Sequence, residues 1–280
     1  FESYATNLVA GDTNSVTDIF VHDRQTGETA RVSVDTGNIQ GDHISYNASI
    51  SADGRYVAFA SSATNLVAGD TNGARDIFVH DRQTGETTRV SVDSDGAQGN
   101  SSSYSASISA DGRYVAFDSN ATNLVADDTN GARDIFVHDR QTGETTRVSV
   151  DTGNIQGNGI SLVARISADG RYVAFESYAT NLVAGDTNSV TDIFVHDRQT
   201  GETTRVSVRS DGAQGNSSSY NARISADGRY VAFDSWAANL VANDTNNWQD
   251  VFVHDRQTGE TTRASVGTGN IQSNGHSFNA

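Results

Sequence analysis

The fold follows from a ten-residue stretch, Ile50-Ser-Ala-Asp-Gly-Arg-Tyr-Val-Ala-Phe59, which the chain contains four times. It returns unchanged at residues 108–117, 166–175 and 224–233, so successive copies lie 58 residues apart. Counted from Phe1, this period divides the chain into repeats 1–58, 59–116, 117–174, 175–232 and 233–280, the last ten residues short. A repeat that cannot bury its own apolar face must stack on its neighbours, so we predict a single domain over 1–280.

Each repeat contains four short segments typical of β-strands. In the third repeat they lie around 105–108, at 112–119 after the Asp111-Gly112 turn, at 134–140 and at 145–150, the last two joined by a turn that contains Gly143. The apolar residues alternate with period two, which excludes a helical solenoid, and the repeat is too long for a β-helix. Four antiparallel strands repeated radially predict an all-β fold, a five-bladed β-propeller built from near-identical four-stranded blades.

The repeat resembles the WD40-like propeller repeat of the TolB type in three segments: Ser109-Ala-Asp-Gly-Arg-Tyr-Val-Ala-Phe117, Asp134-Ile-Phe-Val-His-Asp139 and Gly143-Glu-Thr145. It departs from that family where Ala52, Ala110, Ala168 and Ala226 stand in place of the usual Pro, and in a long loop between the second and third strands. The resemblance implies a propeller, a fold that serves as scaffold, binding platform or companion of an enzyme.

Composition narrows the class of partner. The net charge is −16, from 35 acidic and 19 basic residues, and every basic residue is Arg. Such a surface repels phosphate backbones and anionic lipid, so nucleic acid is not an expected partner. Membrane insertion is not expected either, because no apolar run approaches the roughly 18 residues that a spanning helix needs. There is no Cys, Met or Pro, and the chain begins inside a repeat, which we interpret as a mature or trimmed stretch of a secreted or cell-surface protein.

The two ends of the sequence complement one another. The chain opens at Phe1 with the end of a second strand, followed by strands near 18–23 and 29–34, and it closes at 277–280 with the start of a first strand. The counterpart of residues 224–232 is missing between them. Either a longer parent supplies that segment or a neighbouring copy does, and the second alternative predicts self-assembly into a homo-oligomer or filament through strand addition.

An acidic loop recurs in every repeat, with Asp, Asn and Asp at positions 1, 3 and 7. Alternating oxygen ligands of this kind suit Ca²⁺, although the Gly and Glu that complete an EF-hand loop are absent. The alternative is that these side chains cap turns by accepting backbone hydrogen bonds. The candidate calcium ligands are Asp12, Asn14, Asp18, Asp70, Asn72, Asp76, Asp128, Asn130, Asp134, Asp186, Asn188, Asp192, Asp244, Asn246 and Asp250.

Catalysis within the chain is not expected. A catalytic site is normally one asymmetric group of residues, whereas every plausible candidate here occurs in four or five copies. No Gly-x-Ser-x-Gly elbow, Walker loop or His-Glu-x-x-His motif is present. One strand position holds a histidine in each repeat, for which we predict a packing or hydrogen-bonding role beside the following Asp: His22, His80, His138, His196 and His254. His43 and His276 lie in variable loops, and we expect them to be exposed polar residues.

The copies differ in only a few clusters of positions, which include the aromatic residues Tyr4, Tyr178, Trp236 and Trp248. Aromatic rings among Asn, Asp and Ser can form protein- or carbohydrate-binding patches, although loops also tolerate change without any function. The leading prediction is a non-catalytic structural or interaction module. The alternatives are a multivalent glycan-binding lectin and the propeller appendage of a larger enzyme.

Overall fold

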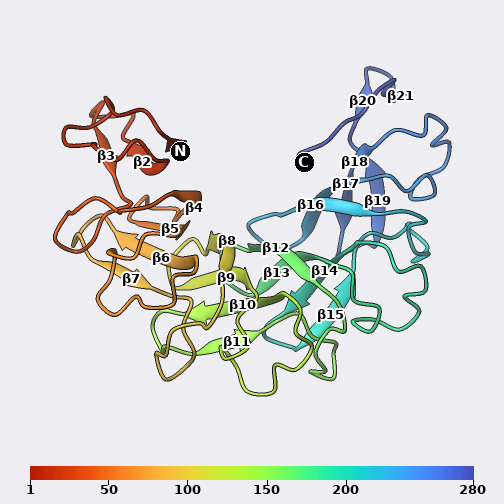
Figure 1. The fold of residues 1–280 in the computed structure, drawn as a ribbon. Coiled ribbons are helices and arrows are strands. Elements are labelled where there is room, and N and C mark those ends of the chain that lie inside the picture. Colours follow the sequence, from red (N-terminus) through yellow and green to blue (C-terminus); the bar gives the residue numbers. More distant parts are fainter. The chain divides into compact units, whose positions relative to one another are not determined.

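The computed structural model describes residues 1–280 and consists of strands without any helix (Figure 1). The sequence therefore provides no helix long and apolar enough to cross a membrane. Five antiparallel sheets follow one another along the chain, and we call them blades 1 to 5. Blade 1 has three strands and blades 2 to 5 have four each, which confirms the predicted five-bladed, all-β fold.

The strands of each blade pair in chain order. Blade 1 contains β1 (Glu2–Ser3), β2 (Asp18–His22) and β3 (Thr29–Arg31). Blade 2 contains β4 (Ser45–Ile50), β5 (Tyr56–Ser61), β6 (Asp76–Asp81) and β7 (Thr87–Arg89), and blade 3 contains β8 (Ser103–Ile108), β9 (Tyr114–Ser119), β10 (Asp134–Asp139) and β11 (Thr145–Arg147). Blade 4 contains β12 (Ser161–Ile166), β13 (Tyr172–Ser177), β14 (Asp192–Asp197) and β15 (Glu202–Arg205), and blade 5 contains β16 (Ser219–Ile224), β17 (Tyr230–Ser235), β18 (Asp250–Asp255) and β19 (Glu260–Arg263).

Two predicted strands differ in the structure. The fourth strand of blade 3 ends at Arg147 instead of Val150, because the Ile135 N–H donates to the Ser149 hydroxyl and not to a backbone carbonyl of that strand. Residues 277–280 form no strand, although the Ser277 N–H donates to the Gln249 carbonyl as the Ser45 N–H does to Thr17.

A small two-stranded sheet, β20 (Val266–Gly267) and β21 (Ile271–Gln272), follows blade 5. It is the last copy of a turn that appears in the other repeats as an isolated bridge between a Val and a Gln, such as Val34 and Gln40. The small sheet is therefore part of the repeat and adds no further blade.

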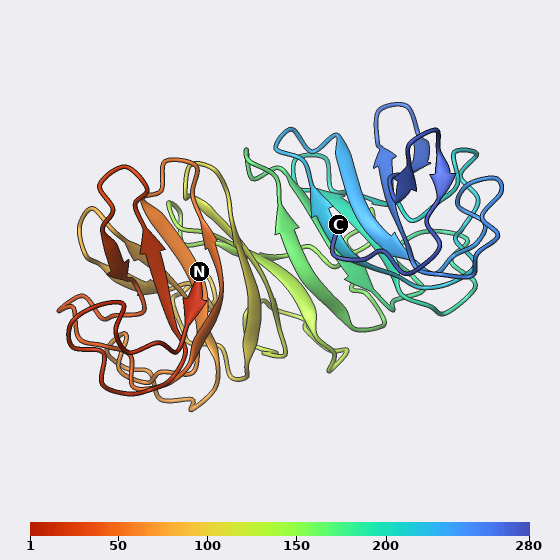
Figure 2. The same cartoon turned by 90° about the horizontal axis from the view of Figure 1, so that it is seen from above.

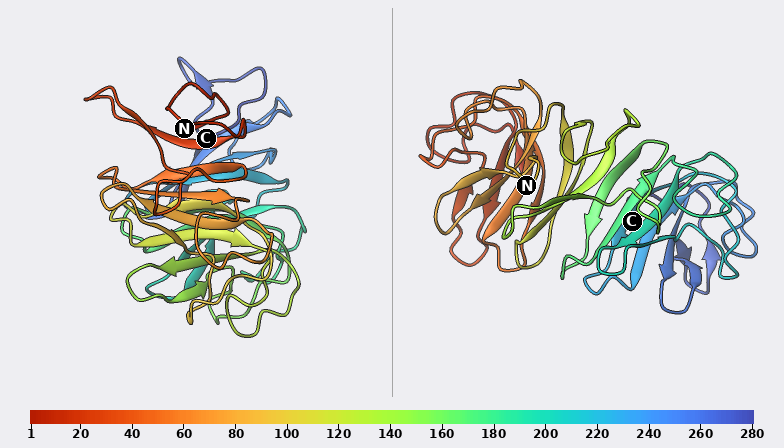
Figure 3. Two further views of the ribbon diagram at one scale, coloured as in Figure 1. Left: turned by 60° about the vertical axis from the view of Figure 1, so that its left-hand side comes forward. Right: turned by 90° about the horizontal axis from the view of Figure 1, so that it is seen from below.

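The chain packs as two compact units, one formed by residues 1–131 and 136–146 and the other by 132–135 and 147–280. Within each unit, successive sheets lie face to face (Figures 2 and 3). In the first unit, Ile77 and Val79 of blade 2 share an apolar cluster with Ala106, Ile108 and Val115 of blade 3. Period-two alternation thus buries both faces of the inner strands, as stacking requires. The prediction of a single domain stays a prediction.

Neighbouring blades also interlock through the repeated Asp-Gly-Arg-Tyr segment. The Tyr56 ring of blade 2 lies against Gly112 of blade 3, where a Cβ atom would approach its Cδ2 to 2.1 Å, and Arg140 stacks on the same ring at 4.4 Å. Gly112 also has φ of +73°, so both space and backbone conformation require glycine. In the second unit, Tyr172 packs against Gly228 and Arg256 in the same way. We call this arrangement the tyrosine interlock.

Candidate functional site

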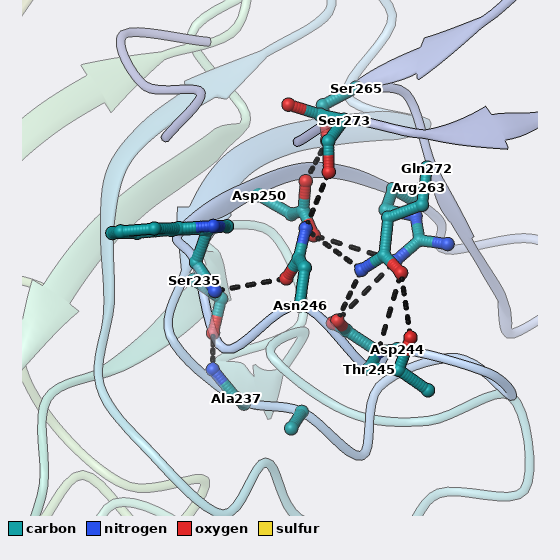
Figure 4. Close-up of polar contacts among 12 residues, drawn as sticks. Ser235, Ala237, Asp244, Thr245, Asn246, Asp250, Arg263, Ser265, Gln272 and Ser273 are labelled. Carbon is teal, nitrogen blue, oxygen red and sulfur yellow. Dashed lines mark hydrogen bonds and ion pairs between the residues drawn. The ribbon is translucent and has the colours of Figure 1, made fainter. Parts of the chain in front are cut away.

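The first and last carboxylates of the acidic loop meet at one end of a β-hairpin, as the fifth copy shows (Figure 4). Asp250 begins β18 and Arg263 ends the paired strand β19, while Asp244 lies in the preceding loop. The Arg263 Nη1 atom is 3.4 Å from an oxygen of each carboxylate. The Gln272 side-chain amide donates to Asp244 at 2.7 Å and to Asp250 at 3.4 Å, and the Ser265 hydroxyl donates to Asp250 at 2.5 Å.

The same carboxylate–guanidinium–amide network recurs in the other described copies. Arg31 bridges Asp12 and Asp18, Arg89 bridges Asp70 and Asp76, and Arg205 bridges Asp186 and Asp192, with the Arg Nη1 atom 3.4–3.8 Å from each carboxylate. Burial raises the pKa of Asp18, Asp70, Asp192 and Asp244. In the third copy Asp128 and Asn130 belong to the first unit and Asp134 to the second, where Ser149 and Gln156 donate to Asp134.

The Asn side chain of each loop caps a turn. Its oxygen accepts a backbone N–H and does not point towards the two carboxylates. The Asn72 Oδ1 atom accepts the Ala74 N–H at 2.8 Å, and the side-chain nitrogen donates to the Gly99 carbonyl at 2.9 Å. The residue after this Asn is left-handed in each copy, with φ of 60° at Gly73 and 56° at Asn247. This geometry is that of the turn-capping alternative.

The donor set fits a cation poorly. Calcium takes six to eight oxygen ligands, whereas each loop offers two carboxylates that already face a permanently charged guanidinium. No group of three or more His, Cys, Asp or Glu side chains is placed to hold a metal ion. The sequence pattern missed the partners Arg263 and Gln272 because they come later in the repeat, although both positions keep the same residue in all five copies. Calcium binding stays a prediction, and its test is given below.

The five strand histidines bond to a threonine seven residues onward and not to the following Asp. The His80 Nδ1 atom lies 2.9 Å from Thr87 Oγ1, and the Thr87 hydroxyl donates its single proton to the Val34 carbonyl at 2.5 Å. The proton between the first pair must therefore sit on His80 Nδ1. Burial lowers the pKa of His138 and His196 to about 4 and also lowers the pKa of His80 and His254. These rings act as hydrogen-bonding links between blades.

The structure brings together two of the four predicted aromatic residues. Trp236 and Trp248 both contact the His276 ring, with centroids 4.9 and 4.4 Å apart, and the two indoles are 44% and 42% exposed. The His276 Nδ1 atom accepts the Gln249 N–H at 3.3 Å, which holds the ring between them. We call Trp236, Trp248 and His276 the aromatic cluster. Tyr4 and Tyr178 are exposed at the same repeat position as Trp236, in other blades.

His276 is the residue whose role the sequence analysis missed. Its repeat position holds Ile44, Ser102, Ile160 and Ser218 in the other copies, so a histidine occurs there only beside the two tryptophans. That coincidence within one repeat is a signal that could have revealed the cluster. The chain therefore has one aromatic cluster and no ring of equivalent ones.

Consecutive antiparallel blades joined in chain order, with neighbouring blades interlocked face to face within each unit, define a β-propeller, the fold of TolB. No family model matches the chain, and no curated protein matches its sequence. Among solved structures, TolB from Acinetobacter baumannii matches with a TM-score of 0.52 and 19% identity, over 88% of this chain and 48% of that one. A structure from a study of two prolyl endopeptidases matches with a TM-score of 0.54 and 15% identity, over 89% and 32%. The chain thus spans half or less of these proteins, and the likeness establishes the fold alone.

Proposed function

We propose that the chain is a non-catalytic interaction module, secreted or displayed on a cell surface, that binds a protein partner through the aromatic cluster. The observation that carries this proposal is the single group of Trp236, Trp248 and His276, exposed on loops that differ between the copies. Tryptophan is enriched among the residues that dominate binding energy, because it buries a large area at little entropic cost.

The remaining candidate residues support a non-catalytic role. The acidic-loop carboxylates bond to Arg, Gln and Ser side chains, and the buried histidines bond to threonines between blades. A nucleophile or general base needs to face a substrate. Groups already held in repeated internal networks are better suited to positioning the loops that carry the aromatic cluster.

A multivalent glycan-binding lectin is the second candidate, favoured by Tyr4 and Tyr178, which are 77% and 46% exposed at the repeat position of Trp236. It predicts that several blades contribute to binding, whereas the leading proposal predicts one site. A propeller appendage of a larger enzyme is the third candidate, supported by the partial coverage of the endopeptidase chain. The sequence that flanks this chain in its gene tests that candidate.

The test selects ligands for the full chain from a random peptide library and, in parallel, from a glycan array. Peptides enriched on the wild type should bind at least about tenfold more weakly to Trp236→Ser and Trp248→Ser, since truncated aromatic anchors commonly cost this much. Tyr178→Ser is the matched control and should bind normally. Glycan binding that falls with Tyr178→Ser as well would favour the lectin, and ligands unaffected by all three variants would refute a role for the cluster.

A further inference from the structure

Arg75 occupies a loop position at which the copies differ. It directly precedes β6, at the repeat position that follows that of Trp248. The Ser102 hydroxyl accepts the Arg75 N–H at 3.3 Å, and the Ser103 N–H donates to the Arg75 carbonyl at 2.8 Å, so the backbone is held against blade 3. The side chain is not dictated by the repeat, because the other copies have Thr17, Arg133, Thr191 and Gln249 at this position.

The Arg75 guanidinium lies over the rings of two tyrosines. Its central carbon is 4.3 Å from the ring centroid of Tyr46 on β4 and 4.6 Å from that of Tyr104 on β8. Both distances are those of a cation–π contact, which holds a guanidinium in place without neutralising its charge. We call Tyr46, Arg75 and Tyr104 the arginine stack. It lies in blades 2 and 3 of the first unit, and both of these blades have four strands.

No carboxylate pairs with Arg75. Elsewhere in blades 2 and 3, Arg55, Arg89 and Arg113 form ion pairs with aspartates, and Arg140 donates to the Gly112 carbonyl. The Arg75 Nε atom is buried without an acceptor, and Nη1 and Nη2, which have no acceptor either, are accessible to solvent. A partly buried cation without a partner costs free energy. An anion from outside the chain would offset that cost.

The chemistry of the arginine stack favours a carboxylate carried by a peptide. Two nitrogens of one guanidinium match the two oxygens of a carboxylate, and one guanidinium compensates one negative charge. The net charge of −16 opposes anions of higher charge, such as phosphate groups. Tyr46 and Tyr104 are only partly exposed and each has a face against Arg75, so neither offers an open ring to a sugar. Arginine and tyrosine are enriched where proteins bind one another.

We propose that the arginine stack binds an acidic peptide segment of a partner protein, with one Asp or Glu carboxylate of that segment paired to Arg75. The two tyrosines position the guanidinium, and the peptide carboxylate replaces water at its exposed nitrogens. A charge pair of this kind supplies specificity more than affinity. The variable loop thus presents a cation in blade 2 and an indole in blade 5. The proposal is independent of the aromatic cluster and holds even if that cluster binds nothing.

The experiment selects peptides from a random library on the full chain, with counterselection on Arg75→Thr. Repeats 1 and 4 have Thr at this position, so the fold accepts the substituted residue. Peptides that bind the wild type and not the variant should share an Asp or Glu at one position. In fluorescence anisotropy, replacing that residue by Asn or Gln should weaken binding to the wild type about tenfold or more. The same replacement should cause no further loss on Arg75→Thr.

Arg24→Thr is the matched control, because it removes the same charge from an exposed arginine outside the arginine stack, and it should bind the selected peptides normally. Equal weakening by Arg24→Thr and Arg75→Thr would reduce the effect to net charge and overturn the proposal. Selected peptides without a shared acidic residue, or no peptide that depends on Arg75, would overturn it too. Oligogalacturonate binding that Arg75→Thr abolishes, without any Arg75-dependent peptide, would assign the carboxylate to a glycan instead.

Discussion

Val163 is the most strained side-chain position of the first strands. These strands contain a bulge with a left-handed residue at the same place in each blade, with φ of 55° at Asn47, 52° at Ser105, 57° at Val163 and 56° at Asn221. Asparagine tolerates this region far better than a β-branched residue, whose Cβ approaches the following carbonyl. The register shift between Leu162 and Arg165 places Val163 in this conformation.

Val163→Asn should therefore raise the free energy of unfolding by about 1 kcal/mol, the usual scale of left-handed strain. The reverse change in the next blade, Asn221→Val, should lower it by at least as much, because it also removes the bond from the Asn221 amide to Asp234. Urea denaturation of both variants measures the effect. Loss of stability in Val163→Asn would show that the bulge is not strained.

The sequence identified the residues of the acidic loop, but it could not show whether they bind a metal ion or pair with other side chains. The spacing of Asp244 and Asp250 predicted that their carboxylates meet, and they do, since both contact Arg263. Metal binding and internal ion pairing use the same carboxylates, so the Asp pattern alone could not distinguish them. The deciding groups, an arginine on β19 and a glutamine on β21, meet the loop only through strand pairing.

At the level of the element, the outer hairpin of each blade couples stability to pH. The histidines of blades 2 to 5 are neutral in the folded chain because burial lowers their pKa, to about 4 for His138 and His196. The unfolded chain gains protons on these residues near pH 6.5, before the folded chain does. The neutral histidines therefore make their full contribution to the free energy of unfolding above pH 6.5, and this contribution is lost as the pH falls towards 4.

We expect the melting temperature to fall between pH 6.5 and 4, with a shallower slope in the double variant His138→Gln, His196→Gln. The buried aspartates with raised pKa act in the opposite direction, because protonation relieves their desolvation. Thermal melts across this range provide the measurement. If the melting temperature of the double variant fell with pH as steeply as that of the wild type, other groups would control acid stability.

Strand existence was predictable at this scale, whereas strand ends were not. Alternation of Val, Ile and Phe with polar residues, bounded by Asp-Gly and Thr-Gly turns, located all four strands of a blade. The fourth strand of blade 3 ends early, at Arg147, because the Ser149 hydroxyl takes the Ile135 N–H that would otherwise continue the ladder. Alternation continues across that point, so it cannot mark the end.

For the whole molecule, calcium removal separates the two interpretations of the acidic loops. The guanidinium in each network already compensates the carboxylates, so we expect the same melting temperature in excess EGTA as in calcium. If several sites bound calcium, saturation would add about 2.7 kcal/mol for each at a hundredfold excess over the dissociation constant, and chelation would lower the melting temperature clearly. That fall would support calcium binding.

The five-fold count of blades was predictable because a period of 58 residues leaves little freedom in how identical strands stack. The aromatic cluster was not predictable, because residues from three loops that are separated in sequence form it. His276 has no counterpart in the other repeats that would have indicated its role. Contacts that repeat can be inferred from one copy, whereas a contact that occurs once depends on where the loops lie.

The tyrosine interlock has a consequence for inheritance. The same residues meet at both junctions, as Tyr56 with Gly112 shows in one and Tyr172 with Gly228 in the other. One junction between blades can therefore replace the other without any change in the contacting residues. Unequal crossing-over between the nearly identical gene segments would join the end of one copy to the start of another and leave a tyrosine interlock of this kind intact. An insertion or deletion inside a copy would displace the ring from its slot. Related genes should therefore differ in length by whole multiples of 58 codons.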